Sequence, residues 1–133
     1  IGKGLLTVEG LHAIQAELDR QLATEGVALD GWYFCPHAGR GNDRELVEHP
    51  DRKPGPGMLL RAAAEHDLDL ARSWMVGDMV SDVLAGRHAG CRATVWVRSG
   101  PDGADLAGHP AVDHVVESIA DLPALVLADG EGR

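Results

Sequence analysis

The chain has 133 residues, a formal net charge of −9, and 44% apolar residues with few aromatics among them. This acidic balance, without any run of lysine or arginine, argues against a nucleic-acid partner. Its apolar runs are too short to span a bilayer, and the two cysteines, Cys35 and Cys91, do not make a disulfide framework. Length and composition predict one domain over residues 1–133, with an aliphatic core, in the cytoplasm and away from membranes.

The N-terminal part is predicted to hold two helices and one short strand. Thr7 is typical of a helix N-cap, and apolar residues then recur every three or four positions to about residue 24. The aromatic run at 31–35 predicts a strand. Residues 36–54 form a polar loop insertion, and a second helix is expected over 57–66.

The C-terminal part alternates strands with helices. Strands are expected at 73–77, 93–97 and 113–118, and helices at 80–89 and 120–128. Such alternation predicts an α/β fold with a parallel sheet, in which the almost wholly apolar run 73–77 is buried on both faces. Because functional groups gather at the carboxyl ends of parallel strands, the residues that follow each strand are the candidates for a site.

Two carboxylates follow the strand predicted at 73–77. Asp78 stands at the strand end, and Asp82 lies four residues further on, within the first turn of a helix. At this spacing both side chains can face one point, which suits a hard cation such as Mg²⁺. The alternative is structural: Asp78 or Ser81 caps the helix and Asp82 interacts with its dipole.

Two cations precede the helix predicted at 57–66. Arg52 and Lys53 are followed at once by the stiff sequence Pro-Gly-Pro-Gly over 54–57. A helix N-terminus favours an anion, and a lysine and an arginine held beside it suit a phosphoryl group. The alternative is a solvated basic pair before a helix.

Taken together, "DRKPGPGM" followed by "SWMVGDMVSD" resembles the last two motifs of the haloacid-dehalogenase (HAD) superfamily of phosphatases. Within it, the chain is similar to the heptose bisphosphate phosphatases and to the related histidinol-phosphate phosphatases. The similarity runs from Leu6 to about Leu125.

The resemblance implies a doubly wound, Rossmann-like parallel sheet and a Mg²⁺-dependent hydrolase acting on a small phosphorylated sugar or metabolite. By the same resemblance Lys53 orients the phosphate and is catalytic, Arg52 and Lys53 bind substrate, and Asp78 is a catalytic Mg²⁺ ligand that Asp82 supports. Heptose enzymes often carry a lysine after the Gly-Asp pair, where this chain has Met79.

The nucleophile of the family is an aspartate in a DxDGT motif, which these 133 residues do not contain. Their D-x-D sequence, Asp67–Asp69, follows no apolar strand and is interpreted as a solvated connection. The resemblance implies that the sheet lacks its two central N-terminal strands. We therefore expect the chain by itself to be inactive, and to be completed by an N-terminal segment or a partner chain.

The loop at 36–54 resembles the zinc loop of the family. Cys35 and His37 match the first pair of ligands, while His49 and Asp51 stand where the family has two further cysteines. A structural Zn²⁺ held by these four residues is chemically possible. The alternative is a loop held by its prolines and polar contacts.

Three functions remain open from sequence. The first is a phosphatase of D-glycero-D-manno-heptose 1,7-bisphosphate that works through an aspartyl-phosphate whose nucleophile lies outside these residues. The second is a histidinol-phosphate phosphatase. The third, of a different class, is a non-catalytic truncated chain or interaction module that retains a phosphate-binding half-site.

Overall fold

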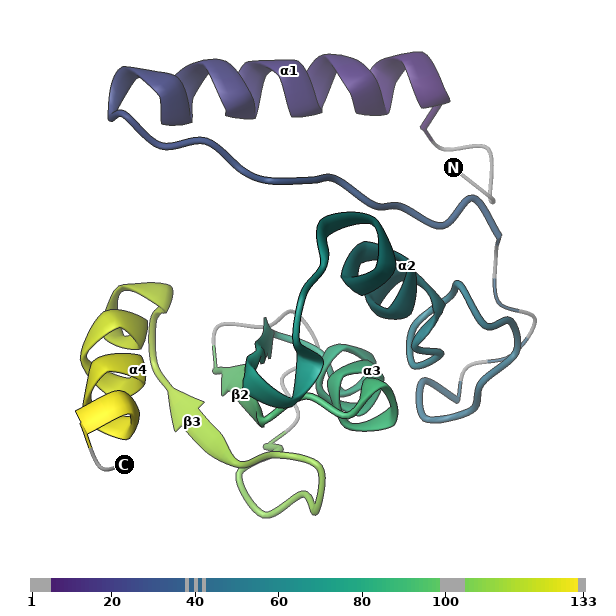
Figure 1. Cartoon of the computed structure of the whole chain (residues 1–133). Helices are drawn as coiled ribbons and strands as arrows, with labels where there is room; N and C mark the ends of the chain where they lie inside the picture. The colour runs from purple at the N-terminus through teal and green to yellow at the C-terminus, as the bar shows by residue number, and fades with distance from the viewer. Residues whose placement is uncertain (1–5, 38, 40, 42, 99–104, 132–133) are drawn as a thin grey trace.

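The computed structural model describes residues 6–37, 39, 41, 43–98 and 105–131 (Figure 1). The helices and strands of this part are α1 (Val8–Thr24), α2 (Gly57–His66), β1 (Trp74–Gly77), α3 (Val80–Ala89), β2 (Ala93–Val97), β3 (His114–Val116) and α4 (Leu122–Glu131). Short 3-10 turns, Leu70–Arg72 and Ile119–Asp121, precede β1 and α4. Among the described residues, no helix is both long enough and apolar enough to cross a membrane.

The described strands form a parallel sheet in the order β1-β2-β3, so β2 lies in the middle and is buried along its whole length. Alternate side chains of a strand point to opposite faces. Val95 and Val97 pack with Val116 and with α4 on one face, whereas Trp96 packs against Val83 of α3 on the other. Helices on both faces of a parallel sheet confirm the predicted α/β class.

Local signals explain where the helices begin and end. The Thr7 hydroxyl accepts a hydrogen bond from the Gly10 N–H (2.9 Å), which caps α1 at the predicted residue. α3 ends at Gly90, whose φ of 84° is one that side chains other than glycine rarely adopt. The observed bounds of α1, α2, α3 and β2 lie within about a residue of those predicted.

The strand predicted at 31–35 is wrong: these residues have no strand pairing. They belong to a segment that returns beneath α1 (Figure 1), held by side chains such as the Trp32 indole, which donates to Asp19 (3.1 Å). A β-strand needs a neighbouring strand for its backbone groups, and no described residue of the chain provides one here.

The burial predicted for 73–77 is also wrong. β1 is half-buried, because it forms one edge of the sheet within the described residues. β3 is shorter than predicted. At the C-terminal end α4 starts at Leu122, after a 3-10 turn capped by Ser118, and continues to Glu131.

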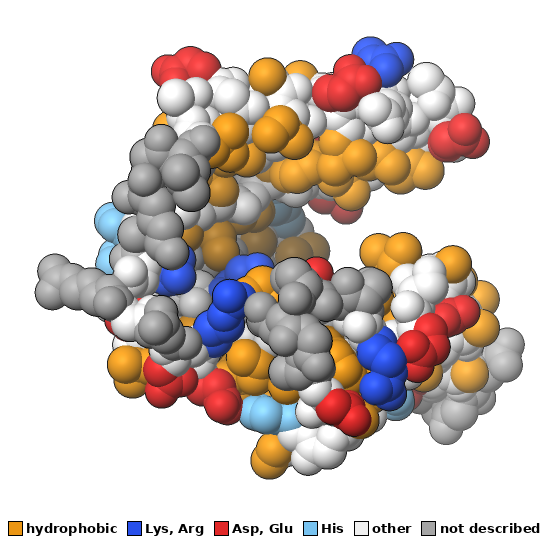
Figure 2. Space-filling view, turned by 180° about the vertical axis from the view of Figure 1, so that it is seen from behind, with side chains coloured by type: hydrophobic (Ala, Val, Ile, Leu, Met, Phe, Trp, Pro, Cys, Tyr) orange, Lys and Arg blue, Asp and Glu red, His pale blue; other side chains and the backbone are white. Residues whose placement is uncertain are grey.

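α1 lies apart from the sheet. It has no buried residue, and Ile14 and Leu18 are 56% and 40% exposed. Figure 2 shows a wide opening between α1 and the rest of the molecule, with apolar side chains along the side of the helix that faces it. The amphipathic pattern that predicts α1 is therefore not matched by packing against the described part of the chain.

Candidate functional site

The turn between β1 and α3 is shaped by Asp82. Its Oδ2 atom accepts hydrogen bonds from the backbone N–H groups of Asp78 and Met79, both at 3.1 Å. Gly77 makes this possible, because a Cβ atom at that position would lie 2.2 Å from the Asp82 Cβ. A glycine at position 77 is therefore required by the close approach of Asp82 to the backbone.

The second oxygen of Asp82 forms an ion pair with the Lys53 ammonium. The Asp82 side chain is 6% exposed and that of Lys53 is 40% exposed. A buried carboxylate is tolerated when all of its oxygens have partners, as they have here. The pair joins the segment before α2 to the first turn of α3 and fixes where the lysine lies.

These contacts match the structural alternative for Asp82, since both of its oxygens are used in the turn and the ion pair. Its predicted support of a metal ion stays a prediction. Asp78 differs: it is exposed, and within the described residues nothing bonds to its carboxylate. An exposed carboxylate at a strand end fits Mg²⁺, a hard cation that takes oxygen ligands and keeps several waters.

The backbone of Asp78 is held from the neighbouring strand. Its carbonyl oxygen accepts from the Trp96 indole N–H (3.2 Å), and Trp96 is the register partner of Gly77 in β2. No motif in the sequence singles out Trp96. The signal that could have identified Trp96 is its position opposite Gly77 in the parallel pairing of β1 with β2.

The cation-bearing turn is compact. Hydrogen bonds from the Arg52 N–H to the His49 carbonyl (3.0 Å) and from the Gly55 N–H to the Arg52 carbonyl (2.8 Å) close it. The Lys53–Pro54 peptide bond is cis, Pro54 is fully buried, and its carbonyl lies 2.8 Å from Nδ1 of His88 on α3. The turn is thus attached to α3, the helix whose first turn contains Asp82.

Arg52, Lys53, Met79 and Ser81 meet at two adjoining pockets. One has a volume of about 370 Å³ and is also lined by residues of the loop at 41–48. The other, of about 350 Å³, is also lined by Tyr33, Phe34, Cys35 and Met58. The structure therefore brings the predicted substrate residues Arg52 and Lys53 to one place, beside the turn that carries Asp78.

The predicted zinc residues are neighbours without a metal-binding arrangement. The rings of His37 and His49 are stacked with centroids 3.9 Å apart, and Nδ1 of His49 accepts from the Asp51 N–H (3.1 Å). The Asp51 carboxylate pairs with Arg61 (3.5 Å), and the Cys35 thiol lies 3.9 Å from the His37 carbonyl oxygen. In the described part of the chain, no group of three or more His, Cys, Asp or Glu is placed to hold a metal ion. Zinc stays a prediction.

Tyr33, beside one of the pockets, and Cys91, just after α3, have raised pKa values. A hydrogen bond to Glu65, together with burial, raises the pKa of the Tyr33 phenol, so Tyr33 lines its pocket as a neutral donor. Burial raises the pKa of the Cys91 thiol. This shift disfavours the thiolate and agrees with a packing role for Cys91.

A parallel sheet with a carboxylate at a strand end, beside a lysine and the start of a helix, has the arrangement of an α/β phosphohydrolase. The HAD-hydrolase-like family matches residues 51–122. The chain is 43% identical over 129 residues to the D-glycero-β-D-manno-heptose-1,7-bisphosphate 7-phosphatase of Yersinia pestis, covering 96% of this chain and 68% of that protein. The enzyme of the same name from Pasteurella multocida is 42% identical, with 95% and 68% covered.

A solved structure agrees with these matches. The D,D-heptose 1,7-bisphosphate phosphatase from B. bronchiseptica, complexed with magnesium and phosphate, superposes with a TM-score of 0.78 at 33% identity. The match covers 96% of this chain and 68% of that one. The chain belongs to the HAD family of hydrolases and is a phosphatase of the HAD type, as its motifs predict.

Proposed function

We propose that this chain forms the phosphate- and magnesium-binding part of a phosphatase that acts on D-glycero-β-D-manno-heptose 1,7-bisphosphate. The observation that carries the proposal is the Lys53–Asp82 ion pair, which places a lysine beside Asp78 at a strand end. The names of the relatives support the substrate, and the magnesium and phosphate of the B. bronchiseptica enzyme support the ligands.

Each site residue then has a distinct role. Lys53 neutralises a phosphoryl oxygen, and Arg52, which lines the same pockets, contacts the substrate. Asp78 is the carboxylate ligand of Mg²⁺, with Asp82 supporting it through the turn. When bound, Mg²⁺ supplies stabilisation of the charge that develops on the phosphoryl oxygens.

The attacking group lies outside these 133 residues, which contain no DxDGT motif. In the proposed reaction an aspartate oxygen attacks phosphorus, the P–O bond to the sugar breaks, and the sugar oxygen takes up a proton. Water then cleaves the aspartyl-phosphate and releases orthophosphate. Lys53 and Arg52 hold the phosphoryl group in line for both steps.

Binding tests the proposal first. Calorimetric titration with inorganic phosphate in the presence of Mg²⁺ is expected to show binding by the 133-residue chain and a loss of about tenfold or more in Lys53→Met. The control is Arg72→Gln, at the opposite end of β1, because it removes one positive charge away from the site. Equal losses in the two variants would contradict the role of Lys53.

Turnover tests it second, with heptose 1,7-bisphosphate and histidinol phosphate as alternative substrates. The chain alone is expected to release no orthophosphate. We expect orthophosphate release when the chain is mixed with the segment of the Yersinia pestis relative that has no counterpart in these 133 residues. The release is expected to be faster from heptose 1,7-bisphosphate than from histidinol phosphate. Release by the chain alone, or faster release from histidinol phosphate, would contradict the proposal. Phosphate binding without turnover in either case would favour a non-catalytic module.

Zinc in the loop and a cytoplasmic location belong to the same proposal. Cys35 and Cys91 are both free thiols, as a reducing compartment would keep them. Metal analysis after dialysis decides between the two alternatives for the loop: a structural Zn²⁺ that Cys35→Ser would lose, or a loop held without metal by its prolines and polar contacts. Zinc-free protein that keeps its fold and its phosphate affinity would show that polar contacts hold the loop instead.

A further inference from the structure

The loop at 43–48 forms one wall of the larger pocket. Asp43, Arg44, Leu46 and Glu48 line it together with Lys53 and Ser81. Arg44 reaches the turn that follows β1: its Nη1 atom lies 3.4 Å from the Met79 sulfur. A further cation, from a segment separate from the turn that carries Arg52 and Lys53, therefore lies at the pocket beside the Asp78 turn.

His109 attaches this loop to the sheet. Its Nε2 atom lies 2.8 Å from the Glu45 carboxylate, and its Nδ1 atom accepts from the Ala111 N–H at 3.1 Å. Because Nδ1 accepts, the ring proton is on Nε2, which donates to Glu45. Glu45 is the next residue after Arg44, so this contact restricts where the arginine lies.

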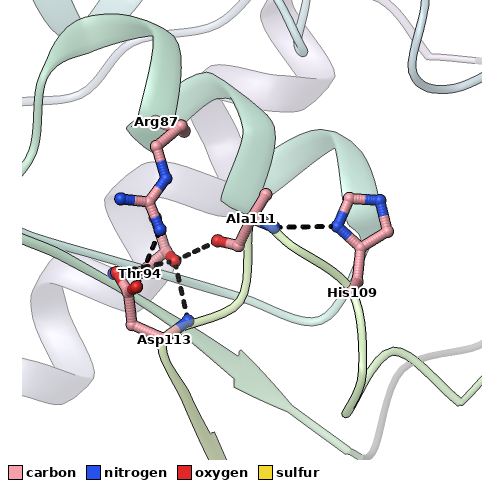
Figure 3. A network of polar contacts seen from close by, with 5 residues as sticks. All are labelled: Arg87, Thr94, His109, Ala111 and Asp113. Atoms are coloured by element: carbon pink, nitrogen blue, oxygen red, sulfur yellow. Dashed lines mark hydrogen bonds and ion pairs between the residues drawn. The ribbon is translucent and has the colours of Figure 1, made fainter.

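Figure 3 shows what holds His109 in place. The Thr94 hydroxyl of β2 donates to the Ala111 carbonyl, and the Thr94 N–H donates to the Asp113 carboxylate (2.9 Å). Arg87 of α3 donates to the same carboxylate at 2.7 Å. The segment that carries His109 is thus bonded to both the central strand and α3. Through the contact between His109 and Glu45, the loop at 43–48 is attached to this part of the fold.

The charges of the pocket show why a cation beyond Arg52 and Lys53 matters, because the carboxylates of Asp43 and Glu48 line it as well. The Lys53 ammonium is already paired with Asp82, so it offers a partly neutralised charge. A volume of about 370 Å³ is within the range of about 300–1,000 Å³ typical of small-molecule sites, which leaves room beyond one phosphoryl group. Arginine binds phosphate through two parallel N–H bonds.

We propose that Arg44 is a specificity-determining residue that binds the second phosphoryl group of a bisphosphorylated sugar, and that His109 positions it through Glu45. This inference rests on the proposed function and deepens it. Lys53 binds the phosphoryl group that reacts, and Arg44 selects substrates that carry another one.

The test compares two ligands in calorimetric titrations of the full chain with Mg²⁺. Arg44→Gln is expected to weaken binding of heptose 1,7-bisphosphate about tenfold or more, while inorganic phosphate binds within about twofold of the unmodified chain. Arg44→Lys retains a positive charge but cannot form two parallel N–H bonds to a phosphate. Its affinity for heptose 1,7-bisphosphate is expected to lie between those of the unmodified chain and Arg44→Gln. Arg72→Gln is the charge-matched control and is expected to change neither affinity.

Two His109 variants test the positioning. His109→Ala is expected to weaken bisphosphate binding in the same selective way, and His109→Gln, which keeps an N–H donor for Glu45, to restore most of it. If the unmodified chain binds both ligands and Arg44→Gln equals Arg72→Gln, the inference is wrong and the proposed function stands. If the unmodified chain binds neither ligand, the proposed function fails, and the inference fails with it.

Discussion

Lys53 and Asp82, 29 residues apart in the chain, form an ion pair that connects the turn before α2 to the first turn of α3. Each residue belongs to a different sequence motif. The pair sets the position of the lysine relative to Asp78, because Asp82 also holds the Asp78 N–H. The proposed catalytic arrangement therefore depends on one carboxylate that bonds both to the backbone of the turn and to the lysine.

Asp82→Asn is expected to lower both stability and phosphate affinity. It removes the charge that faces Lys53, and breaking a buried pair costs about 3–5 kcal/mol, reduced here to about 1–3 kcal/mol because the lysine is partly exposed. Urea unfolding and phosphate titration measure the two effects. Asp30→Asn, an exposed residue with the same change of charge, is the control. Equal unfolding free energies in the two variants would rule out a structural role for the pair.

Gly77→Ala is expected to displace Asp82 from the turn. The new Cβ would lie 2.2 Å from the Asp82 Cβ, and such overpacking costs about 1–3 kcal/mol. Gly108→Ala is the matched control, because nothing lies within 4 Å of its Cβ position. Thermal unfolding of both variants tests this, together with phosphate titration. A Gly77 variant as stable as the Gly108 variant would mean that the turn tolerates a side chain.

Trp96→Phe is expected to weaken Mg²⁺ binding by a few-fold. The substitution keeps an aromatic ring in the core but removes the N–H that holds the Asp78 carbonyl, a hydrogen bond worth about 0.5–1.5 kcal/mol. Mg²⁺ titration in the presence of phosphate is the measurement. Trp32→Phe also loses an indole donor, the one that contacts Asp19 on α1, and is expected to leave the Mg²⁺ affinity unchanged.

Asp113 is expected to contribute stability that disappears in acid. Burial acts to raise the pKa of its carboxyl, but hydrogen bonds from Arg87 and Thr94 outweigh this and hold it below the ordinary value of 3.8. A carboxyl with a lowered pKa stabilises the fold fully above its unfolded pKa, and this contribution is lost as the pH falls through the folded value.

The free energies of unfolding of the unmodified chain and Asp113→Asn should therefore differ by about 1–2 kcal/mol from about pH 5 to 8. The difference should narrow below pH 3.8. Asp105→Asn, whose side chain is 72% exposed, serves as the control and should show almost no difference at any pH. A difference for Asp113→Asn that stays constant into acid would exclude the lowered pKa.

Much of the fold was predictable because its signals are local. Thr7 caps α1 and Gly90 ends α3 through contacts and dihedral angles within a few residues of each. The absence of a strand at 31–35 was not predictable in this way. The aromatic composition of these residues favours a strand, but strand formation depends on a neighbour that no described residue supplies.

The candidate site also combines residues that local sequence signals indicate with contacts that they do not. Lys53, Arg52 and Asp78 are proposed as site residues from the chemistry expected at a helix start and a strand end. The bonding partners of the two Asp82 oxygens could not be predicted from sequence, because a carboxylate at that spacing can face a metal ion or the backbone equally well. The contact of Trp96 could not be predicted from a motif, because its indole N–H bonds to a residue that follows the neighbouring strand.

The sequence by itself determined the α/β class, the HAD resemblance and the residue types that a phosphate and Mg²⁺ require, because these depend on local periodicity and on short motifs. Only the tertiary structure decided that Asp82 holds Lys53, that Trp96 holds Asp78, and that the Arg44 loop is attached to His109. Those contacts join segments far apart in the chain, and their geometry follows from how β1, β2 and α3 pack together.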